Sequence, residues 1–541
     1  MKRRTVVVLT IIFIAAVLRF YQLGKNPPSL DWDEASLGYN AYSLFKTGKD
    51  EYGNSWPISI RSFNDYKPPL YTYITIPSIA IFGLTEFAVR FPSALAGTLT
   101  VLLTYFLVRE FFPRLKLTVF SYQLSVSEIT ALLMAISPWH LQFSRVAFEA
   151  NLALFFFVLA AYLFIRWIHS EKPVFLIGSV LAFALTMYSY HSARVIIPAF
   201  LFLMTVIFRK LLFERWKAVV FGLFVGLFLM VPMALTLIHG SAQARFSTVS
   251  VFTNPGIFTQ EEERLSRQEG YRKQDKGSLI SLLHNRSLVL TTIILENYFD
   301  HFNLDFLFLK GDGIGRHTAV GMGLLYYWEF PFLIFGLYFI IKDKLSGNKF
   351  LISWLAVAPF ASALTTQTPH AVRSLLMVIP LEIIVAYGII QSIKAFKNHL
   401  YILVFICLFA IGNFFYYLDL YYIHTPIERS HDWQYGYREV VEKVKQHEAN
   451  LEKVIITTKY DQPYIFFLFY DKVDPSWYQT VAENGANGFG KYVFRKVEYQ
   501  RDSRLPHVLI VGSPEEIPSD APTIDSVKFL NGKTAFVLTK T

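Results

Sequence analysis

Three carboxylates lie within four residues in the segment Leu30-Asp31-Trp32-Asp33-Glu34-Ala35. The segment follows an apolar run at the N-terminus, so it borders an apolar surface. Partial burial raises a carboxylate pKa and suits such a group to proton abstraction. Acidic residues are also favoured in the first turn of a helix, and ASLGYNAYSLF follows as a plausible helix. The pattern alone therefore supports a catalytic acid and a helix start equally.

A lysine held by two prolines follows in the same loop, in Asp65-Tyr66-Lys67-Pro68-Pro69. The Pro-Pro pair fixes the backbone and directs Lys67 into an extended conformation. A rigidly held lysine at a membrane interface can neutralise a lipid phosphate. Taken alone, the motif is explained better by a lysine that extends to the headgroup boundary.

Other ionisable side chains recur at the ends of apolar runs, with both signs of charge present. Each of them alone is more often an interfacial anchor, but ionisable groups at membrane depth are candidates for function. Cations beside carboxylates suit a site where a phosphate leaves while an acceptor hydroxyl or amine is deprotonated. The candidates beyond the first loop are Arg90, Arg145, Glu149, Asn151, His191, His301, Arg316, His370 and Arg373.

Motifs for bound cofactors do not stand out in the sequence. We find no Cys/His ligand spacing, no P-loop and no dinucleotide-binding glycine turn. The one cysteine, Cys407, leaves no internal disulfide and no cysteine-based metal site. The sequence therefore implies no particular cofactor, and we assign no residue as a metal ligand. Carboxylates and histidines are nevertheless compatible with a divalent ion. Because nothing implies a nucleotide as direct donor, a lipid-linked donor is the consistent alternative.

The elements that position these residues are predicted to be membrane helices. Of the 541 residues, 53% are hydrophobic and 17% are charged, against about a quarter charged in soluble proteins. The apolar residues form runs of roughly 17–22 residues, which is long enough to cross a bilayer as helix. We predict a polytopic α-helical membrane protein with about eleven spans. Their approximate ranges are 5–18, 88–108, 124–138, 150–168, 174–189, 195–208, 218–238, 321–341, 350–365, 374–393 and 399–420.

The basic residues predict the orientation. The net charge is +10, yet the lysines and arginines collect in short loops between apolar runs, which indicates topology and not nucleic-acid binding. With the N-terminus in the cytoplasm, every loop that must also lie inside is short and basic, as the positive-inside rule requires. These loops begin near residues 109, 166, 209, 342 and 394. The long loops 23–87 and 239–320, and the chain after about 421, then lie outside.

Two outer segments and the C-terminal region complete the predicted architecture. The apolar stretches 71–84 and 280–297 are too short to span comfortably and predict interfacial helices. Residues 437–449 predict an amphipathic helix, followed by short strands in LEKVIITT, KYVFRKVEY, PHVLIVG and TAFVLTK. We therefore predict a membrane domain over 1–425 and a small extracytoplasmic α/β domain over 430–541.

These motifs resemble those of the polyprenyl-phosphate-sugar-dependent glycosyltransferases of the GT-C fold, which include protein O-mannosyltransferases and lipid A aminoarabinose transferases. The likeness covers about residues 5–400 and is strongest over 28–110. It implies a GT-C fold and the inverting transfer of a single hexosyl or pentosyl group. The donor would be a polyprenyl-phosphate-linked sugar within the membrane lipid, and the acceptor an extracytoplasmic protein, lipid or glycan. It implies no nucleic-acid partner. We expect a prokaryotic plasma membrane protein with an extracytoplasmic active site.

The resemblance also implies residue roles. Asp33 resembles the catalytic general base, and Glu34 is its neighbour in the catalytic motif. Glu149 or Asn151 falls where relatives carry a second acidic residue, with the register open. The positions implied for the lipid phosphate are Lys67, Arg90, Arg316, His370 and Arg373. The remaining site candidates are Tyr66, Arg145, Glu149, Asn151, His191 and His301.

Three alternatives differ in what they predict. A transporter or lipid flippase also has many spans and intramembrane charges, but such proteins often contain inverted repeats, and here the charges gather at one face. A structural or assembly protein would depend on the C-terminal region and tolerate changes at Asp33. The sequence lacks the Trp-Trp-Asp motif of oligosaccharyltransferases, which disfavours transfer of a preassembled glycan.

Overall fold

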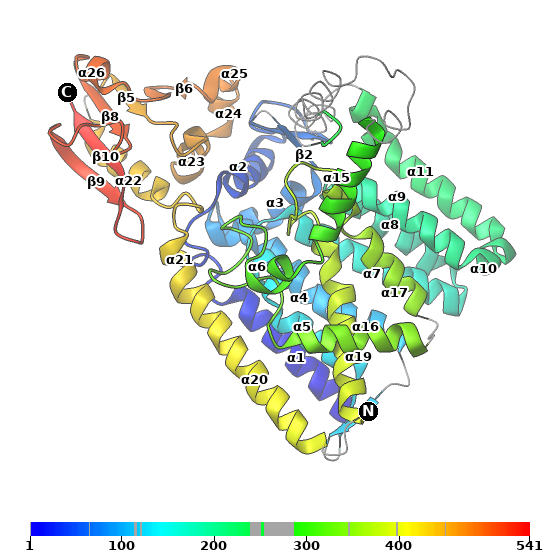
Figure 1. The fold of residues 1–541 in the computed structure, drawn as a ribbon. Coiled ribbons are helices and arrows are strands. Elements are labelled where there is room, and N and C mark those ends of the chain that lie inside the picture. The colour runs from blue at the N-terminus through cyan, green and yellow to red at the C-terminus, as the bar shows by residue number, and fades with distance from the viewer. Residues whose placement is uncertain are drawn as a thin grey trace, which may run out of the picture.

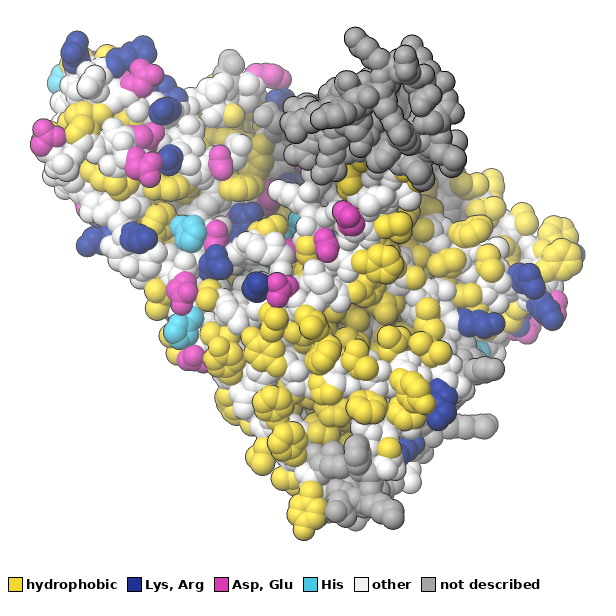
Figure 2. All heavy atoms as spheres, viewed as in Figure 1, with side chains coloured by type: hydrophobic (Ala, Val, Ile, Leu, Met, Phe, Trp, Pro, Cys, Tyr) yellow, Lys and Arg dark blue, Asp and Glu magenta, His cyan; other side chains and the backbone are white. Residues whose placement is uncertain are grey.

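The computed structural model describes residues 2–63, 65–112, 116–119, 122–238, 250–253, 286–343, 347–395, 399–449 and 451–541. Figure 1 shows a bundle of helices with a smaller unit, built around a sheet, docked at one end. The N-terminus lies at the opposite end of the bundle from that unit. Hydrophobic side chains cover the visible bundle surface, whereas charged side chains gather on the sheet-bearing unit and near its junction with the bundle (Figure 2).

Among the described residues, five helical segments are long and apolar enough to cross a membrane: Glu86–Phe111, Glu149–Ser170, Trp216–Thr236, Leu375–Ala395 and Leu403–Glu428. Three of the predicted spans, 124–138, 174–189 and 195–208, coincide with the shorter apolar helices α5 (Val126–Ile136), α8 (Pro173–Ser189) and α9 (Ala193–Ile207). The expectation of a helical membrane protein is confirmed, whereas the total of about eleven spans stays a prediction. The basic residues Arg114, Lys344 and Lys397 lie outside the described residues.

The helices of the bundle have the following bounds: α1 Lys2–Phe20, α2 Trp32–Thr47, α3 Leu70–Phe82, α4 Glu86–Phe111, α5 Val126–Ile136, α6 Pro138–Ser144, α7 Glu149–Ser170, α8 Pro173–Ser189, α9 Ala193–Ile207, α10 Arg209–Glu214, α11 Trp216–Ile238, α15 Arg286–Asp300, α16 Glu329–Asp343, α17 Asn348–Val357, α18 Phe360–Ala363, α19 Val378–Ala395, α20 His399–Asp419 and α21 Thr425–Glu428. Two hairpins pair β1 (Ile60–Ser62) with β2 (Asp65–Lys67) and β3 (Lys116–Val119) with β4 (Tyr122–Ser125). Short π-helices span Asp305–Leu309 and Leu420–His424, and a short 3-10 helix spans Leu375–Met377.

Glycines set the close packing of α16 on α19. A Cβ at Gly336 would collide with the carbonyl oxygen of Ile384, and a Cβ at Gly388 would collide with that of Phe332. The two backbones therefore approach as closely as small residues allow, which is how membrane helices gain van der Waals contact.

The loop 23–87 is ordered by local signals in its sequence. Helix α2 starts at a capping box and ends at Gly48, which has the left-handed φ of 70° that terminates helices. Lys67 lies in strand β2 opposite Ile60, so the extended conformation expected from the two prolines is observed. Helix α3 begins directly after them and confirms the short apolar helix predicted for 71–84. Its counterpart near 280–297 is observed as α15, with 280–285 outside the described residues.

The C-terminal residues form a six-stranded mixed sheet of order β6-β7-β5-β8-β10-β9, in which β5 lies parallel to β7 and β8. The predicted helix is observed, and the four predicted strands fall on β5, β7, β8 and β10. The bounds are α22 Tyr437–His447, β5 Lys453–Ile456, α23 Pro463–Tyr470, α24 Pro475–Tyr478, α25 Ala482–Gly485, β6 Gly488–Phe489, β7 Tyr492–Phe494, α26 Tyr499–Asp502, β8 Val508–Gly512, β9 Thr523–Lys528 and β10 Thr534–Lys540. The domain boundary near residue 430 stays a prediction.

This sheet-bearing unit packs on α2, the helix that carries the acidic motif. The Tyr39 hydroxyl donates to the Val473 carbonyl at 3.1 Å, and a Cβ at Gly38 would lie 2.7 Å from the ring of Phe469. Gln479 Nε2 reaches back to the hydroxyls of Ser43 and Thr47. These contacts join the sheet-bearing unit to α2.

A buried acid lies at this junction. Glu51 is fully buried, and Asn40 Nδ2 donates to its Oε1 at 3.1 Å, while its Oε2 has no hydrogen-bond partner among the described residues. Burial, opposed by the Asn40 hydrogen bond, raises the pKa of Glu51 to about 8. The folded protein therefore favours the protonated form of this carboxyl near neutral pH.

This shift predicts a pH-dependent stability. The pKa of Glu51 in the folded protein lies above its usual value near 4.5, so the folded state binds the proton more tightly than the unfolded state. The contribution of this group to folding stability is complete below pH 4.5 and is lost as the pH rises through about 8. We expect the free energy of unfolding to fall by about 1.4 kcal/mol per pH unit within this window. Melting of the detergent-solubilised chain between pH 6 and pH 8 measures the effect. Glu51→Gln removes the titrating group, so an unchanged slope in this variant would show that another group is responsible.

Candidate functional site

The acids of the acidic motif, residues 31–34, lie in two different environments. Asp31 and Glu34 are fully buried, whereas the side chain of Asp33 is 41% exposed. Successive residues on a helix point about 100° apart, so the first turn of α2 directs Glu34 inward and its neighbour Asp33 outward. The two members of the predicted catalytic pair therefore have different roles.

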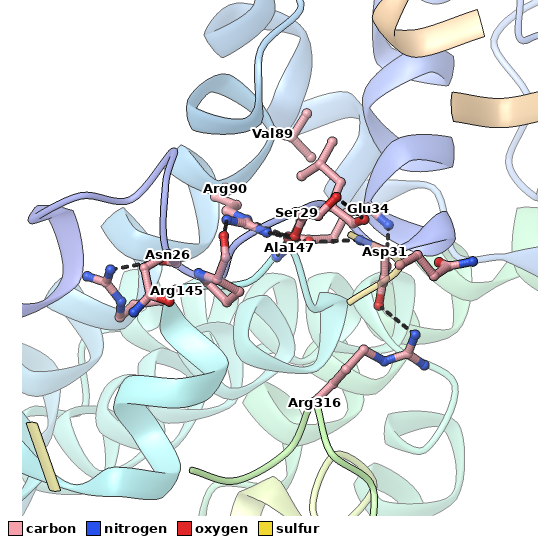
Figure 3. A network of polar contacts seen from close by, with 12 residues as sticks. Asn26, Ser29, Asp31, Glu34, Val89, Arg90, Arg145, Ala147 and Arg316 are labelled. Carbon is pink, nitrogen blue, oxygen red and sulfur yellow. Dashed lines mark hydrogen bonds and ion pairs between the residues drawn. The ribbon is translucent and has the colours of Figure 1, made fainter. Parts of the chain in front are cut away.

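Glu34 forms a two-pronged ion pair with Arg90 of α4 (Figure 3). Arg90 Nε donates to Oε1 and Nη2 donates to Oε2, both at 2.9 Å, and the backbone N–H of Ala147 also donates to Oε1. The remaining Arg90 donors reach the carbonyls of Leu23, Pro27 and Ser29. All five guanidinium N–H groups are thus engaged. These contacts engage the polar groups of Glu34 and Arg90 with each other and with the backbone. The catalytic role expected for Glu34 and the phosphate-binding role expected for Arg90 stay predictions.

Asp31 starts α2 and also faces a cation. Its Oδ1 accepts the N–H of Glu34 at 2.8 Å, while Glu34 Oε2 accepts the N–H of Asp31, so the helix-start interpretation is confirmed. Arg316 Nη1 lies 3.5 Å from Asp31 Oδ2, and its guanidinium lies over the Trp32 ring at 4.8 Å. Burial raises the pKa of Asp31 to about 6, although Arg316 opposes the shift. The contact brings the predicted residue Arg316 to the acidic motif.

Asp33 and Lys67 form the accessible part of the site. Lys67 Nζ lies 2.6 Å from Asp33 Oδ1 and 3.4 Å from the Asp33 carbonyl oxygen. Burial lowers the pKa of Lys67, but the carboxylates of Asp33 and Glu149 outweigh it and raise the pKa above its ordinary value. Lys67 is therefore held as a buried ammonium beside a carboxylate that reaches solvent.

An open apolar groove of about 640 Å³ begins two residues after Lys67. Pro69, Leu70 and Tyr73 line it from the start of α3, and Leu185 and Tyr188 line it from α8. The other lining residues are Trp56, Ile58, Ile76, Pro77 and Pro232. The groove has the chemistry of a site for a hydrocarbon chain.

Two later segments bring a carboxylate and three histidines together. Asp312 Oδ2 lies 2.6 Å from His317 Nδ1 and accepts the N–H of Ala371 at 2.8 Å. His301 Nε2 accepts the backbone N–H of His370 at 3.3 Å. Burial lowers the pKa of His301 to about 4. Burial raises the pKa of Asp312, but His317 outweighs it, so the net shift is downward.

This histidine cluster lies beside the acidic motif. His317 directly follows Arg316, the partner of Asp31, and its ring lies 5.8 Å from that of Phe148. Phe148 precedes Glu149, the carboxylate that acts on Lys67. Asp312, His317 and His370 also place potential ligand atoms within 4.8 Å of one another. Sequence reasoning did not group these three, because 53 residues separate His317 from His370.

The other predicted residues are dispersed around this centre. The guanidinium of Arg145 donates to the carbonyls of Leu18, Arg19 and Asn26 and to the Tyr421 hydroxyl, so it clamps the end of α1 and is not open to substrate. Asn151 is buried and donates to Ser93, whereas Glu149 starts α7 and acts electrostatically on Lys67. Which of the two corresponds to the second acidic residue of relatives stays open.

His191 and Arg373 contact segments that carry other predicted site residues. His191 Nε2 lies 2.9 Å from the carbonyl oxygen of Tyr66, so Tyr66 takes part through its backbone. Arg373 Nη1 donates to Thr365 Oγ1 at 2.7 Å and to the Gln367 carbonyl at 3.3 Å. Arg373 thereby orders the loop that precedes His370.

The residues just before the sheet-bearing unit also reach the site, which the sequence did not indicate. Gln434 Oε1 accepts the N–H of Trp32 at 2.8 Å, and the Asp432 carbonyl lies 3.5 Å from Arg316 Nη1. The Trp433 ring lies 6.0 Å from the Arg90 guanidinium. Between 116 and 402 residues separate these partners, so no local pattern could have predicted the contacts.

The buried pair predicts a stability difference between neighbouring acids. Glu34→Gln leaves the Arg90 charge buried without a carboxylate, and we expect a loss of about 3–5 kcal/mol, seen as a lower melting temperature in detergent. Glu442→Gln, which disrupts the exposed pair between Glu442 and Arg438, should cost at most about 1 kcal/mol. Equal melting temperatures for the two variants would show that the pair does not stabilise the fold.

Comparison with known proteins supports the resemblance seen in the motifs. The profile of the dolichyl-phosphate-mannose-protein mannosyltransferase family matches residues 66–235. YkcB of Bacillus subtilis, which is described as a candidate mannosyltransferase, is 27% identical over 203 residues. That match covers 36% of this chain, and the chain spans only a quarter of the length of that relative.

Solved structures show the same fold over nearly the whole chain. ArnT from Cupriavidus metallidurans in the apo state matches with a TM-score of 0.56 at 12% identity, covering 99% of this chain and 98% of ArnT. ArnT bound to undecaprenyl phosphate also gives a TM-score of 0.56 at 12% identity, covering 98% of this chain and 97% of ArnT. The chain is therefore an integral membrane protein with the fold of ArnT, and residues 66–235 are similar to the mannosyltransferase family.

Proposed function

We propose that the chain transfers a single sugar from a polyprenyl-phosphate-linked donor to an acceptor outside the cytoplasm, with Asp33 as the general base. The observation that supports this is the ion pair between buried Lys67 and exposed Asp33, close to an apolar groove. The proposal includes an N-terminus in the cytoplasm of a prokaryotic cell, as the basic loops predict.

The donor would lie across the two parts of this centre. Its polyprenyl chain would occupy the groove of Leu70 and Tyr73, which places the phosphate toward Lys67. An ammonium has three donors, so Lys67 can contact a phosphate oxygen while it keeps its bond to Asp33. Arg316 reaches the same motif through Asp31 and adds a second positive charge. The ArnT structure with undecaprenyl phosphate shows that this fold accommodates a polyprenyl phosphate in that protein.

The chemistry follows from the placement of the charges. Asp33 takes the proton from an acceptor hydroxyl or amine, and the freed lone pair attacks the anomeric carbon of the sugar. The bond between that carbon and the phosphate oxygen breaks, and its electron pair leaves with the polyprenyl phosphate. Lys67 stabilises the negative charge on the departing phosphate. One displacement inverts the anomeric centre. The proton ends on Asp33 and the negative charge on the departing polyprenyl phosphate.

The base predicts a selective loss of turnover. Asp33→Asn preserves the size of the side chain and an oxygen facing Lys67, but it cannot accept a proton. We expect transfer from polyprenyl-phosphate sugars to fall about 10²–10⁴-fold. The loss of stability should be smaller than for Glu34→Gln, because Asp33 is partly exposed and the amide oxygen still faces Lys67. Asp305→Asn, on the outer surface beside Lys310, is the matched control and should retain wild-type turnover. Full activity in Asp33→Asn would exclude Asp33 as the base.

The lysine predicts a defect in donor binding. Lys67→Gln removes the charge that faces the phosphate, so we expect weaker binding of polyprenyl phosphate by roughly 10-fold or more. Lys67→Arg restores a cation and should recover part of the affinity. Titration of the purified chain with polyprenyl phosphate measures this directly. Flux of the lipid across vesicles without sugar transfer, unaltered in both variants, would favour the flippase alternative.

A further inference from the structure

We propose that Asp312, His317 and His370 form a binding site for a divalent transition metal ion, with zinc as the expected ion. The three residues come from two outer segments, 305–317 and 365–373, and their ligand atoms lie within 4.8 Å of one another. This site is separate from the Asp33–Lys67 centre and does not depend on the proposed transfer reaction.

The ligand set has the chemistry of a zinc site. Two imidazole nitrogens and one carboxylate oxygen form a common three-ligand set for zinc and leave one coordination position open. Hard ions such as magnesium and calcium prefer oxygen ligands, so two histidines disfavour them. The side chain of Asp312 is fully buried, and His317 and His370 are 5% and 8% exposed. Such burial limits competition from bulk water for the ligands.

An unpaired nitrogen points to a missing ligand. His370 Nδ1 is buried and has no hydrogen-bond partner among the described residues. Leaving a polar atom buried without a partner costs about 1–3 kcal/mol, so such atoms usually meet a water or an ion. A metal ion bound by His370 relieves this penalty.

The backbone around the site already orients its ligands. The N–H of Ile314 donates to Asp312 Oδ1 at 3.1 Å, and the N–H of Ala371 donates to Oδ2 at 2.8 Å. His301 accepts the backbone N–H of His370 and so holds the loop that presents this imidazole. Supporting contacts of this kind fix metal ligands in known sites.

Metal binding requires a small local rearrangement. The 2.6 Å contact between Asp312 Oδ2 and His317 Nδ1 is a hydrogen-bond distance. Zinc bonds of about 2.0–2.1 Å in a tetrahedral arrangement place two ligand atoms about 3.3 Å apart. If His317 binds through Nδ1, these atoms separate and the proton shared between them is released on binding. If His317 binds through Nε2, Asp312 instead supports the imidazole from behind.

The bound ion would join the two segments that carry arginines near the site. His317 follows Arg316, which contacts Asp31, and His370 lies three residues before Arg373. The ion therefore acts as a positioning element for these segments. It takes no part in the proton transfer assigned to Asp33.

The test is metal binding by the full-length chain in detergent. After removal of metals with a chelator and addition of zinc, elemental analysis should find about one tightly held zinc ion per chain. His317→Ala and His370→Ala should each weaken zinc binding by about 100-fold or more. His431→Ala, a half-exposed histidine close to the sheet-bearing unit, should bind zinc as the wild type does. Equal zinc binding in all four proteins, or none in the wild type, would overturn the proposal.

A second measurement uses only the wild-type chain, so it does not depend on folding of the variants. X-ray absorption at the zinc edge should show two imidazole nitrogens and carboxylate or water oxygens in the first coordination shell. A shell of oxygens alone would place the ion elsewhere and contradict the assignment. If the wild-type chain retained no zinc, the hydrogen bond between Asp312 and His317 would have only a structural role.

Discussion

The buried ion pair between Glu34 and Arg90 is the interaction on which the arrangement of the site depends. A carboxylate and a guanidinium are costly to remove from water, and the cost is offset only when every donor and acceptor is satisfied. Here the pair meets that condition through carbonyls of residues 23–29 and the N–H of Ala147. The pair thereby ties the start of α2, the chain after α1, helix α4 and the segment before α7 to one point.

That constraint explains why adjacent acids do different work. With Glu34 fixed inward and Asp31 closing the first turn of α2, Asp33 is directed toward Lys67 and solvent. The β1–β2 hairpin and the prolines after Lys67 hold the ammonium in place, and α3 starts the groove directly beyond it. The sheet-bearing unit also packs against α2 and adds contacts that hold this helix. The polar centre and the apolar groove are thus consequences of one buried anchor.

The sequence predicted the features that depend on local pattern. Hydropathy located the apolar helices, the prolines predicted the extended Lys67, and the acidic cluster predicted a helix start. The roles of the acids in that cluster could not be predicted from local pattern, because they depend on distant partners. Glu34 pairs with Arg90, 56 residues later, and Asp31 pairs with Arg316, 285 residues later. In the sequence alone, Arg90 and Arg145 could not be distinguished from arginines that bind a phosphate. Only the structure shows that backbone carbonyls and buried partners occupy their donors.

The histidine cluster illustrates the same limit. Asp312 and His317 are five residues apart, but His370 joins them only through the folding of a second outer segment. Residues 432–434 reach the acidic motif from the other end of the chain. Such contacts depend on the packing of the whole bundle, for which no single stretch of sequence carries a signal.

The most direct test of the account is a cryo-electron microscopy structure of the chain in a lipid nanodisc with a polyprenyl phosphate bound. The account predicts that the phosphate lies within hydrogen-bonding distance of Lys67 Nζ, with the hydrocarbon chain along Leu70 and Tyr73 and the Glu34–Arg90 pair intact. A phosphate bound by Arg90 with Glu34 displaced, or a lipid bound away from the groove, would contradict it.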